Sequence, residues 1–277
     1  MFDAFADIYE AMIDWPKRLA HEGPFYRRWF ERVGVQSVLD SACGSGQHAA
    51  MFHSWGLKVE GADLSSQMID RARSNFGQPP GLGWAVRGFD QPIEPAKSFD
   101  AALCVGNSLA LATDEATVER AIQRMFDAVC DGGLIVIHVL NLWRLPDGPC
   151  VWQKCHRASI SRFTKGTEEE VVGKNPLKME SGLPTTSSVP LSPQGEVLIL
   201  KGLHRCGPRG YVEVIVADLT GVAPMRSEST PLLGIEAPEL ERMAERAGAK
   251  KIAFFGGYQD QPYDRQESVD LVMVAEK

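Results

Sequence analysis

The chain has 277 residues, 44% of them hydrophobic, and a formal net charge of −7. This length and apolar content are sufficient to bury a large core, and no apolar run approaches the ~18 residues of a membrane span. The acidic balance disfavours nucleic acid, because phosphate binding requires a basic surface, and therefore favours a small-molecule partner.

The N-terminal segment is acidic and amphipathic and lacks the basic start of an export signal, so we expect a cytoplasmic protein with reduced cysteines. The six cysteines show no paired framework. Cys150, Cys155 and His156 have the spacing of half a metal site. Because no second half follows at zinc spacing, we predict no metal.

The first 33 residues are predicted to form two helices. Apolar residues recur at helical spacing from Phe5 to Ile13, and Pro24 has the position of a residue that opens a second helix. Strands and helices then alternate, which indicates a mostly parallel sheet covered on both faces. The expected strands are 36–41, 57–62, 83–88, 99–105 and 133–140, and the expected helices are 46–55, 66–75 and 115–130.

An apolar strand runs abruptly into a glycine turn at residues 36–46, QSVLDSACGSG. Gly44 and Gly46 permit positive φ and let a ligand lie against the backbone that opens the next helix. The strand ends in Asp40, where a cationic amine would meet it. The next strand ends in Asp63, 17 residues after Gly46, close to the spacing of a carboxylate that binds a ribose diol. A nucleoside-containing cofactor is predicted.

The same loop, GSGQHA, also fits the GxGxxA pattern of nicotinamide-binding proteins. However, VLDSACGSG followed by GADLS resembles the first two motifs of class I S-adenosylmethionine-dependent methyltransferases. That resemblance implies a glycine loop under the methionine moiety, Asp63 on the ribose hydroxyls and Asp40 near the amino end. Further cofactor contacts predicted beside these are Ala42, Leu64 and Met68.

Phe89 and Asp90 follow the third strand, where this family places residues against the adenine. The resemblance implies that Phe89 or Trp84 stacks on the ring and that Asp90 accepts from its amine. The alternative is that the aromatic residues belong to the core and that Asp90 belongs to a turn.

The fourth strand leads to Gly106, Asn107 and Ser108, similar to a GNS segment of glycine and sarcosine N-methyltransferases. The resemblance implies that Val105 or Gly106 lines the cofactor through the backbone and that Asn107 orients the acceptor. The alternative is that the polar pair merely caps a turn.

The N-terminal stretch DWPKRLAHEGPFYRRWF is similar to the segment that leads into these enzymes. A basic residue there would hold the methionine carboxylate, which implies Arg18, or Lys17 in second place. Tyr9 would cover the cofactor. The alternative for Arg18 is an ordinary surface position.

The chain departs from the glycine enzymes after the fifth strand. Leu140 stands where their arginine binds the amino-acid carboxylate, so we expect an acceptor more apolar than glycine, against Trp143, Trp152 or Leu142. A catalytic base, if one is needed, would be His138 or His48, although a histidine inside a strand is more often a core residue. The predicted catalytic set is Asn107, His138 and Asn141.

From residue 143 the pattern changes to period two, as in antiparallel strands. Residues 174–195 are rich in Pro, Ser, Thr and Gly and are expected to form a mobile loop or lid. A helix at 237–248 and two final strands, which we expect to pair antiparallel, complete the chain. That terminal hairpin also resembles the methyltransferase fold.

We therefore predict a doubly wound, seven-stranded, mostly parallel α/β sheet with an antiparallel β cap inserted after the fifth strand. The cofactor-binding domain would comprise 1–142 and 235–277, with N-terminal helices at 1–33, and the cap 143–234. The predicted activity is methyl transfer from S-adenosylmethionine to a small-molecule amine or hydroxyl, without nucleic acid or membrane partners. The alternatives are an NAD-dependent oxidoreductase and a non-catalytic binder of the cofactor.

Overall fold

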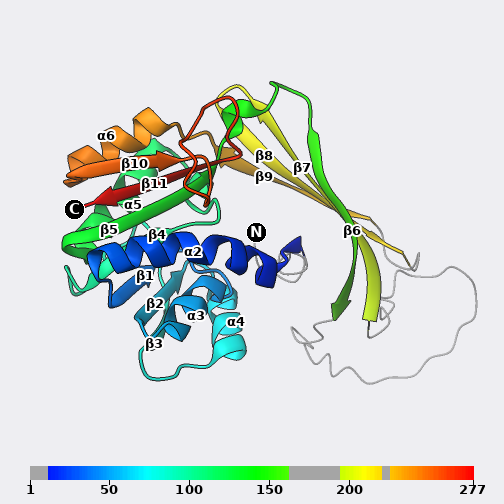
Figure 1. Ribbon diagram of the computed structural model, residues 1–277. Helices are drawn as coiled ribbons and strands as arrows, with labels where there is room; N and C mark the ends of the chain where they lie inside the picture. Colours follow the sequence, from blue (N-terminus) through cyan, green and yellow to red (C-terminus); the bar gives the residue numbers. More distant parts are fainter. Residues whose placement is uncertain (1–11, 162–193, 220–224) are drawn as a thin grey trace, which may run out of the picture.

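The computed structural model describes residues 12–161, 194–219 and 225–277. A seven-stranded sheet forms its centre, in the order β10-β11-β5-β4-β1-β2-β3 (Figure 1). The strands from β3 to β5 pair in parallel, and β11 runs antiparallel to both β5 and β10. Their bounds are β1 Ser37–Asp40, β2 Lys58–Asp63, β3 Leu82–Val86, β4 Phe99–Cys104, β5 Val129–Leu140, β10 Lys251–Phe255 and β11 Asp270–Glu276. The predicted doubly wound sheet and its antiparallel end are confirmed.

Helices cover both faces of this sheet because successive residues of a strand point to opposite sides. Val38 and Leu103 pack beneath α2, α3 and α4, whereas Leu39 and Cys104 pack beneath α5 and α6. The helix bounds are α2 Trp15–Val33, α3 Gln47–Ser54, α4 Ser66–Phe76, α5 Glu115–Ala128 and α6 Ala237–Ala247, with short 3₁₀ turns η2 Leu109–Leu111 and η3 Leu142–Arg144.

The N-terminal helix differs from the prediction, because Pro24 lies inside α2 and does not open a second helix. The helix begins earlier, where the Asp14 side chain accepts from the Lys17 N–H at 3.1 Å. Pro16 occupies the first turn, where its missing N–H leaves no hydrogen bond unmade. A buried apolar face packs on the sheet and keeps the helix continuous through Pro24.

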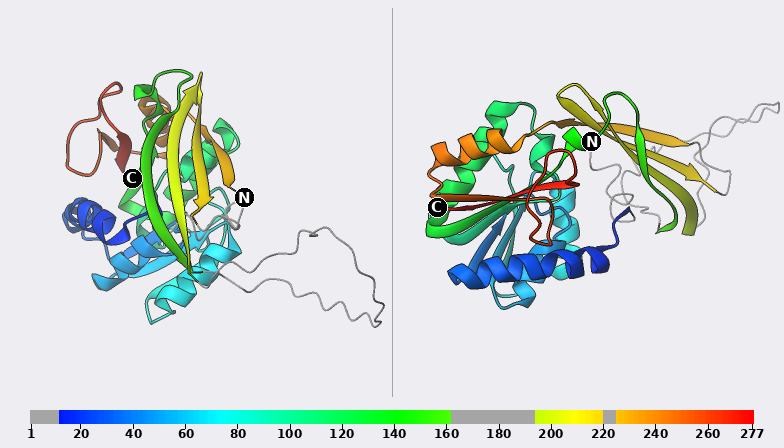
Figure 2. Two further views of the ribbon diagram at one scale, coloured as in Figure 1. Left: turned by 90° about the vertical axis from the view of Figure 1, so that its right-hand side faces the viewer. Right: turned by 45° about the horizontal axis from the view of Figure 1, so that its top comes forward.

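The chain between β5 and α6 forms a second sheet of four antiparallel strands, in the order β6-β7-β8-β9. This cap lies across the carboxyl end of the main sheet, as the further views show (Figure 2), and confirms the predicted insertion after the fifth strand. Its strands are β6 Val151–Ser161, β7 Gln194–Cys206, β8 Arg209–Asp218 and β9 Arg226–Leu233. We propose residues 143–234 as the cap and 1–142 with 235–277 as the main domain; the expected loop at 174–195 lies almost wholly outside the described residues.

Two kinds of structure are not found in the three described ranges. None of their helices combines the length and the apolar character needed to cross a bilayer. Nor do these ranges bring together three or more His, Cys, Asp or Glu side chains in a metal-binding group.

Candidate functional site

The glycine loop joins β1 to α3 at the carboxyl edge of the sheet. Gly44 and Gly46 have φ of 54° and 88°, in the left-handed region that favours glycine. A Cβ on Gly46 would come within 2.6 Å of the Trp84 ring. That indole is buried and donates to the Gly77 carbonyl at 2.7 Å, which favours a core role for Trp84 over one against the adenine. Gly46 therefore serves the packing of the fold as well as the shape of the loop.

Asp63, the predicted ribose carboxylate, is held by the backbone on both sides. Its Oδ2 accepts from the Gly44 N–H and its Oδ1 from the Ser65 N–H, each at 2.9 Å. Ser65 in turn caps α4 by accepting from the Met68 N–H, as its position in the sequence predicts. The carboxylate is thereby fixed against the glycine loop.

Asp40 ends β1 with its side chain 1% exposed and with no hydrogen-bond partner for either carboxylate oxygen among the described residues. Burial raises the pKa of Asp40 to about 6, while the neighbouring His48 and the Ala42 backbone N–H act to lower it. The Ser45 hydroxyl in the glycine loop is likewise buried and unpartnered. Because buried polar groups are normally hydrogen-bonded, these atoms mark a place that a polar ligand completes.

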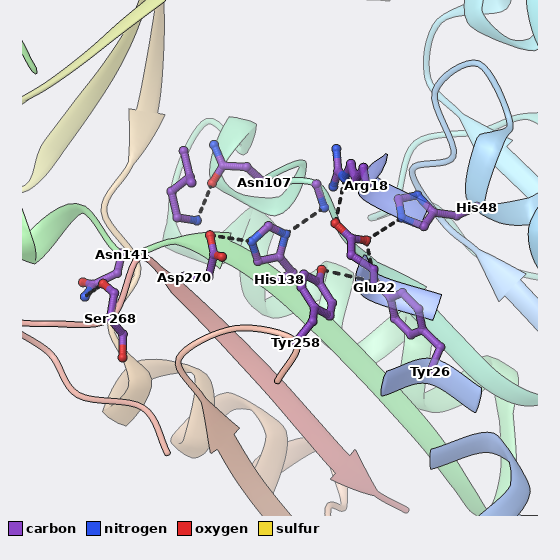
Figure 3. Close-up of polar contacts among 12 residues, drawn as sticks. Arg18, Glu22, Tyr26, His48, Asn107, His138, Asn141, Tyr258, Ser268 and Asp270 are labelled. Atoms are coloured by element: carbon purple, nitrogen blue, oxygen red, sulfur yellow. Dashed lines mark hydrogen bonds and ion pairs between the residues drawn. The ribbon is translucent and has the colours of Figure 1, made fainter. Parts of the chain in front are cut away.

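A network centred on Glu22 of α2 lies beside the loop (Figure 3). Arg18 Nε donates to Glu22 Oε1 at 2.7 Å, and His48 Nε2 lies 2.7 Å from Oε2. The Tyr26 hydroxyl is 3.5 Å from that oxygen and 3.2 Å from the Tyr258 hydroxyl. Burial acts to raise the pKa of Glu22, but the hydrogen bond and charge of His48, with the charge of Arg18, outweigh it and lower the pKa to about 2.

This network places Arg18 at the carboxyl end of β4. A Cβ added to Gly106 would lie 3.5 Å from Arg18 Nη2, so the guanidinium borders the backbone predicted to line the cofactor. Its role as the partner of a carboxylate remains a prediction. His48 is buried and contacts Glu22. Tyr9 lies outside the described residues.

His138 uses both ring nitrogens within the protein. Nδ1 accepts from the Gly106 N–H at 3.1 Å, and Nε2 lies 3.1 Å from Asp270 Oδ1. The backbone donor assigns the neutral ring a hydrogen on Nε2. Asn107, at φ 72°, accepts from the Leu140 N–H at 2.9 Å through Oδ1, which leaves its amide nitrogen to donate to a ligand. The geometry favours positioning by His138 over proton transfer.

Asn141, the third predicted catalytic residue, is 2% exposed and has all of its polar atoms engaged. Its amide nitrogen donates to the carbonyls of Arg265 and Ser268 at 2.9 and 2.8 Å. Its oxygen accepts from the Trp143 N–H and the Tyr263 hydroxyl at 3.2 and 3.3 Å. The side chain joins the start of the cap to the loop before β11. This structural role accounts for an asparagine at position 141 without any contact to the methyl acceptor.

The other predicted contacts gather near the ends of β2 and β3. Leu64 is 73% exposed. A Cβ on Gly88 would lie 3.5 Å from Leu64 Cδ1 and 3.3 Å from Asp90 Oδ1, so an apolar and an acidic group border one spot. Such a pair suits a flat ring that carries an amine. The remaining predicted contacts are Ala42 and Phe89, both partly buried, and Met68 and Val105, both buried.

Known proteins are similar to this chain in sequence over part of its length and in architecture. Residues 38–133 match the family of methyltransferase domains. A glycine/sarcosine N-methyltransferase of Parasynechococcus marenigrum is 29% identical over 156 residues, 52% of each chain. The rabbit (Oryctolagus cuniculus) glycine N-methyltransferase is 28% identical over 194 residues, 61% of this chain and 64% of that one. The chain spans about half the length of most of the curated relatives it matches.

Among solved structures, the chain is similar to a sugar N-methyltransferase from Streptoalloteichus, with a TM-score of 0.67 and 22% identity over 100% of this chain and 92% of that one. It is also similar to an amino pentose methyltransferase with bound S-adenosylmethionine from Micromonospora echinaspora, with a TM-score of 0.65 and 19% identity over 100% and 97%. These likenesses show the fold.

Residues 38–133 are therefore similar to methyltransferase domains. The match to a methyltransferase domain supports S-adenosylmethionine as the cofactor. The residues of the site fit that group, because the buried, unpartnered carboxylate of Asp40 suits a molecule with a cationic amine and sulfonium. Glu22, Tyr26, Tyr258 and Asp270 were missed by the sequence reasoning. Only Glu22 had a local signal, its position four residues after Arg18 on one helix.

Proposed function

We propose that this protein transfers the methyl group of S-adenosylmethionine to an amine or hydroxyl of a small molecule. The observation that carries the proposal is Asp40, a buried carboxylate without a partner at the carboxyl end of β1, beside a glycine loop. An unpaired buried charge lowers the stability of the fold, and a cationic ligand offsets that cost. The relatives that methylate glycine, sarcosine and sugars support a small acceptor.

The proposed roles of the residues follow from their places. Asp63 binds the ribose hydroxyls, Leu64 and Asp90 border the adenine, and Arg18 holds the methionine carboxylate while Glu22 fixes its guanidinium. Bound S-adenosylmethionine supplies a methyl group already activated on a cationic sulfur. The protein's task is then to align the acceptor with that methyl group and to keep water out.

The acceptor would bind at the carboxyl end of the main sheet, which the cap lies across. The amide nitrogen of Asn107 is placed to donate to it, and the hydrogen bond from the Gly106 N–H to His138 fixes the turn that carries Asn107. No proton transfer is assigned to His138. An amine acceptor that arrives deprotonated needs no base to attack the methyl carbon.

The decisive experiment has two measurements. Calorimetric titration with S-adenosylhomocysteine and with NAD tests the cofactor, and we expect binding of the first alone. Incubation of a fractionated metabolite extract with S-adenosylmethionine that carries a labelled methyl group, followed by mass spectrometry, tests the transfer. A labelled small molecule supports the proposal. Binding without any labelled product would instead indicate a non-catalytic binder of the cofactor.

A variant pair checks the site itself. Asp63→Asn should weaken S-adenosylhomocysteine binding by about 1–3 kcal/mol, because buried ribose hydroxyls lose a charged acceptor. Asp70→Asn, on the exposed surface of α4, should leave the affinity unchanged. Equal affinities in both variants would mean that Asp63 does not meet the ribose.

A further inference from the structure

Two lysines stand side by side on the cap. Lys201 of β7 pairs with Lys154 of β6 in the antiparallel register, so both side chains leave the same face of the sheet. Like charges directly opposite each other on neighbouring strands destabilise a sheet. No carboxylate among the described residues forms an ion pair with either lysine, and Lys154 Nζ donates to the carbonyl of Met12 at 3.2 Å.

This face of the cap is turned toward the main domain. Ile199 and Leu203, which flank Lys201 on the same face of β7, are 0% and 2% exposed. Met12 lies two residues before Asp14, the N-cap residue of α2, and packs against the cluster around Ile199. The contact of Lys154 with Met12 and the effect of the Arg18 charge on Lys201 place both lysines beside the segment that leads into α2.

Within residues 12–161, 194–219 and 225–277, these charges have no carboxylate partner. Desolvation lowers the pKa of Lys201, and the positive charges of Lys154 and Arg18 lower it further. The acidic residue in the same row of the sheet, Glu228 on β9, is two strands away from Lys201, or about 10 Å. A partly buried lysine beside a second, exposed lysine is stabilised by an anionic ligand.

We propose that Lys201 and Lys154 bind an anionic group of the methyl acceptor, a carboxylate or a phosphate. This inference rests on the proposed function and names the class of its acceptor: a small molecule with an amine or hydroxyl at one end and a negative charge at the other. The cap thus supplies the cations that the main domain lacks at Leu140. Trp152, which we expected to contact an apolar acceptor, pairs with Gly202 and so leaves the opposite face.

The first test uses the labelled products of the metabolite extract. We expect them to be retained on an anion-exchange resin, and mass spectrometry then separates carboxylates from phosphates. With the purified acceptor, Lys201→Gln should raise KM about tenfold or more, because one charge-assisted contact is lost. Lys201→Arg, which keeps the charge, should retain most of the affinity. Arg157→Gln is the matched control, because Arg157 is an exposed cation on the other face of β6.

Three results of this test would overturn the proposal. They are a labelled product that carries no negative charge, a KM for Lys201→Gln equal to that of Arg157→Gln, and an S-adenosylhomocysteine affinity that falls in Lys201→Gln. The last would assign the lysines to the methionine carboxylate of the cofactor.

A second test needs no activity and separates the two proposals. The ammonium signal of Lys201 is followed by NMR in the protein saturated with S-adenosylhomocysteine while inorganic phosphate or acetate is added. We expect a saturable shift with at least one anion, weaker in Lys154→Gln. If this shift appears and no extract fraction is methylated, the proposed function fails while the anion site stands. Absence of a saturable shift with both anions overturns the anion site.

Discussion

The buried carboxylate of Asp40 lowers the stability of the folded protein when it is ionised. Its folded pKa of about 6 lies above the ordinary value of 3.8, so the folded state holds its proton more tightly than the unfolded state does. The free energy of unfolding therefore falls as the pH rises from about 4 to 6, by on the order of 3 kcal/mol for this group. A residue with this effect at neutral pH is expected where binding needs a negative charge.

Asp40→Asn should consequently have opposite effects on stability and on binding. Without ligand, its free energy of unfolding should exceed that of the unmodified protein by an amount that grows from pH 4 to pH 6 and then stays constant. Its affinity for S-adenosylmethionine should fall about tenfold or more, because a cationic ligand loses its counter-charge. Urea unfolding across pH, with calorimetry, measures both. A stability difference that does not change with pH would contradict this account.

The contribution of Glu22 to the free energy of unfolding has the opposite dependence on pH. Its folded pKa of about 2 lies below the ordinary 4.5, so its contribution to stability is fully present above pH 4.5 and is lost as the pH falls toward 2. Glu22→Gln should lower the free energy of unfolding at pH 7 by about 2–3 kcal/mol, and the difference should close between pH 4.5 and 2. Urea unfolding at several pH values measures it.

The matched control for Glu22 is Glu119→Gln, which removes a surface ion pair with Arg246 in which both side chains are about half exposed. That change should cost no more than about 1 kcal/mol. Equal losses in the free energy of unfolding would mean that the network around Glu22 stabilises the protein no more than a surface ion pair does.

Whether His138 transfers a proton can be decided by His138→Asn. The asparagine oxygen can accept from the Gly106 N–H as Nδ1 does, but the side chain cannot act as a base. We expect kcat to fall less than about tenfold and its pH profile to keep its shape. A loss of about 10²–10⁴-fold, the size of general-base catalysis, would restore His138 to the catalytic set.

At the scale of elements, the glycine loop and Trp84 form one packing unit. Gly46 and Gly56 have nearly the same φ, 88° and 87°, but only a Cβ on Gly46 would meet another group, the Trp84 ring. Gly56→Ala should therefore measure backbone strain alone, about 1–2 kcal/mol. Gly46→Ala should cost about 1–3 kcal/mol more, because the core is already closely packed. Thermal unfolding of the two variants compares them.

Elements were predictable wherever the pattern is local. The strands of the main sheet, the Ser65 cap and the antiparallel final strands follow from apolar runs, capping residues and turn residues within about ten positions. Pro24 was wrongly predicted to begin a helix because proline usually interrupts helices. Here the packing of α2 on the sheet keeps the helix continuous through Pro24. The alternation of residues in β7 also places Lys201 in a row of apolar residues, which is a local signal in the sequence.

The polar site was predictable only in part, for a physical reason. Asp40, Asp63 and the glycines follow strands whose ends meet at one edge, so a rule of topology brings them together. Glu22 with His48, and Tyr26 with Tyr258, are joined only by tertiary packing, across 26 and 232 residues. No periodicity reaches that far. For the same reason, the sequence did not indicate the four hydrogen-bond partners of Asn141.

For the whole molecule, ligand binding should protect one end of the main sheet from hydrogen exchange. S-adenosylhomocysteine should slow amide exchange in residues 41–46, at the end of β2 and in the first turns of α2. A surface depression of roughly 450 Å³ at the amino ends of β1 to β4, lined by residues such as Lys58, Gly81 and Phe99, provides the internal control and should not change. Protection there instead would place the ligand at the wrong edge.

The contact between Tyr26 and Tyr258 also concerns the synthesis of the protein. Arg18 leaves the ribosome long before Tyr258, yet the network that holds Arg18 includes the Tyr258 hydroxyl, which lies 232 residues after Tyr26. Contacts this far apart in sequence form late, after the intervening chain is available to close the loop. A nascent chain that stops within the cap has the glycine loop but lacks β11 and Tyr258. The network around Arg18 is therefore completed only after Tyr258 has been synthesised, so we expect a chain that stops within the cap to bind the cofactor weakly.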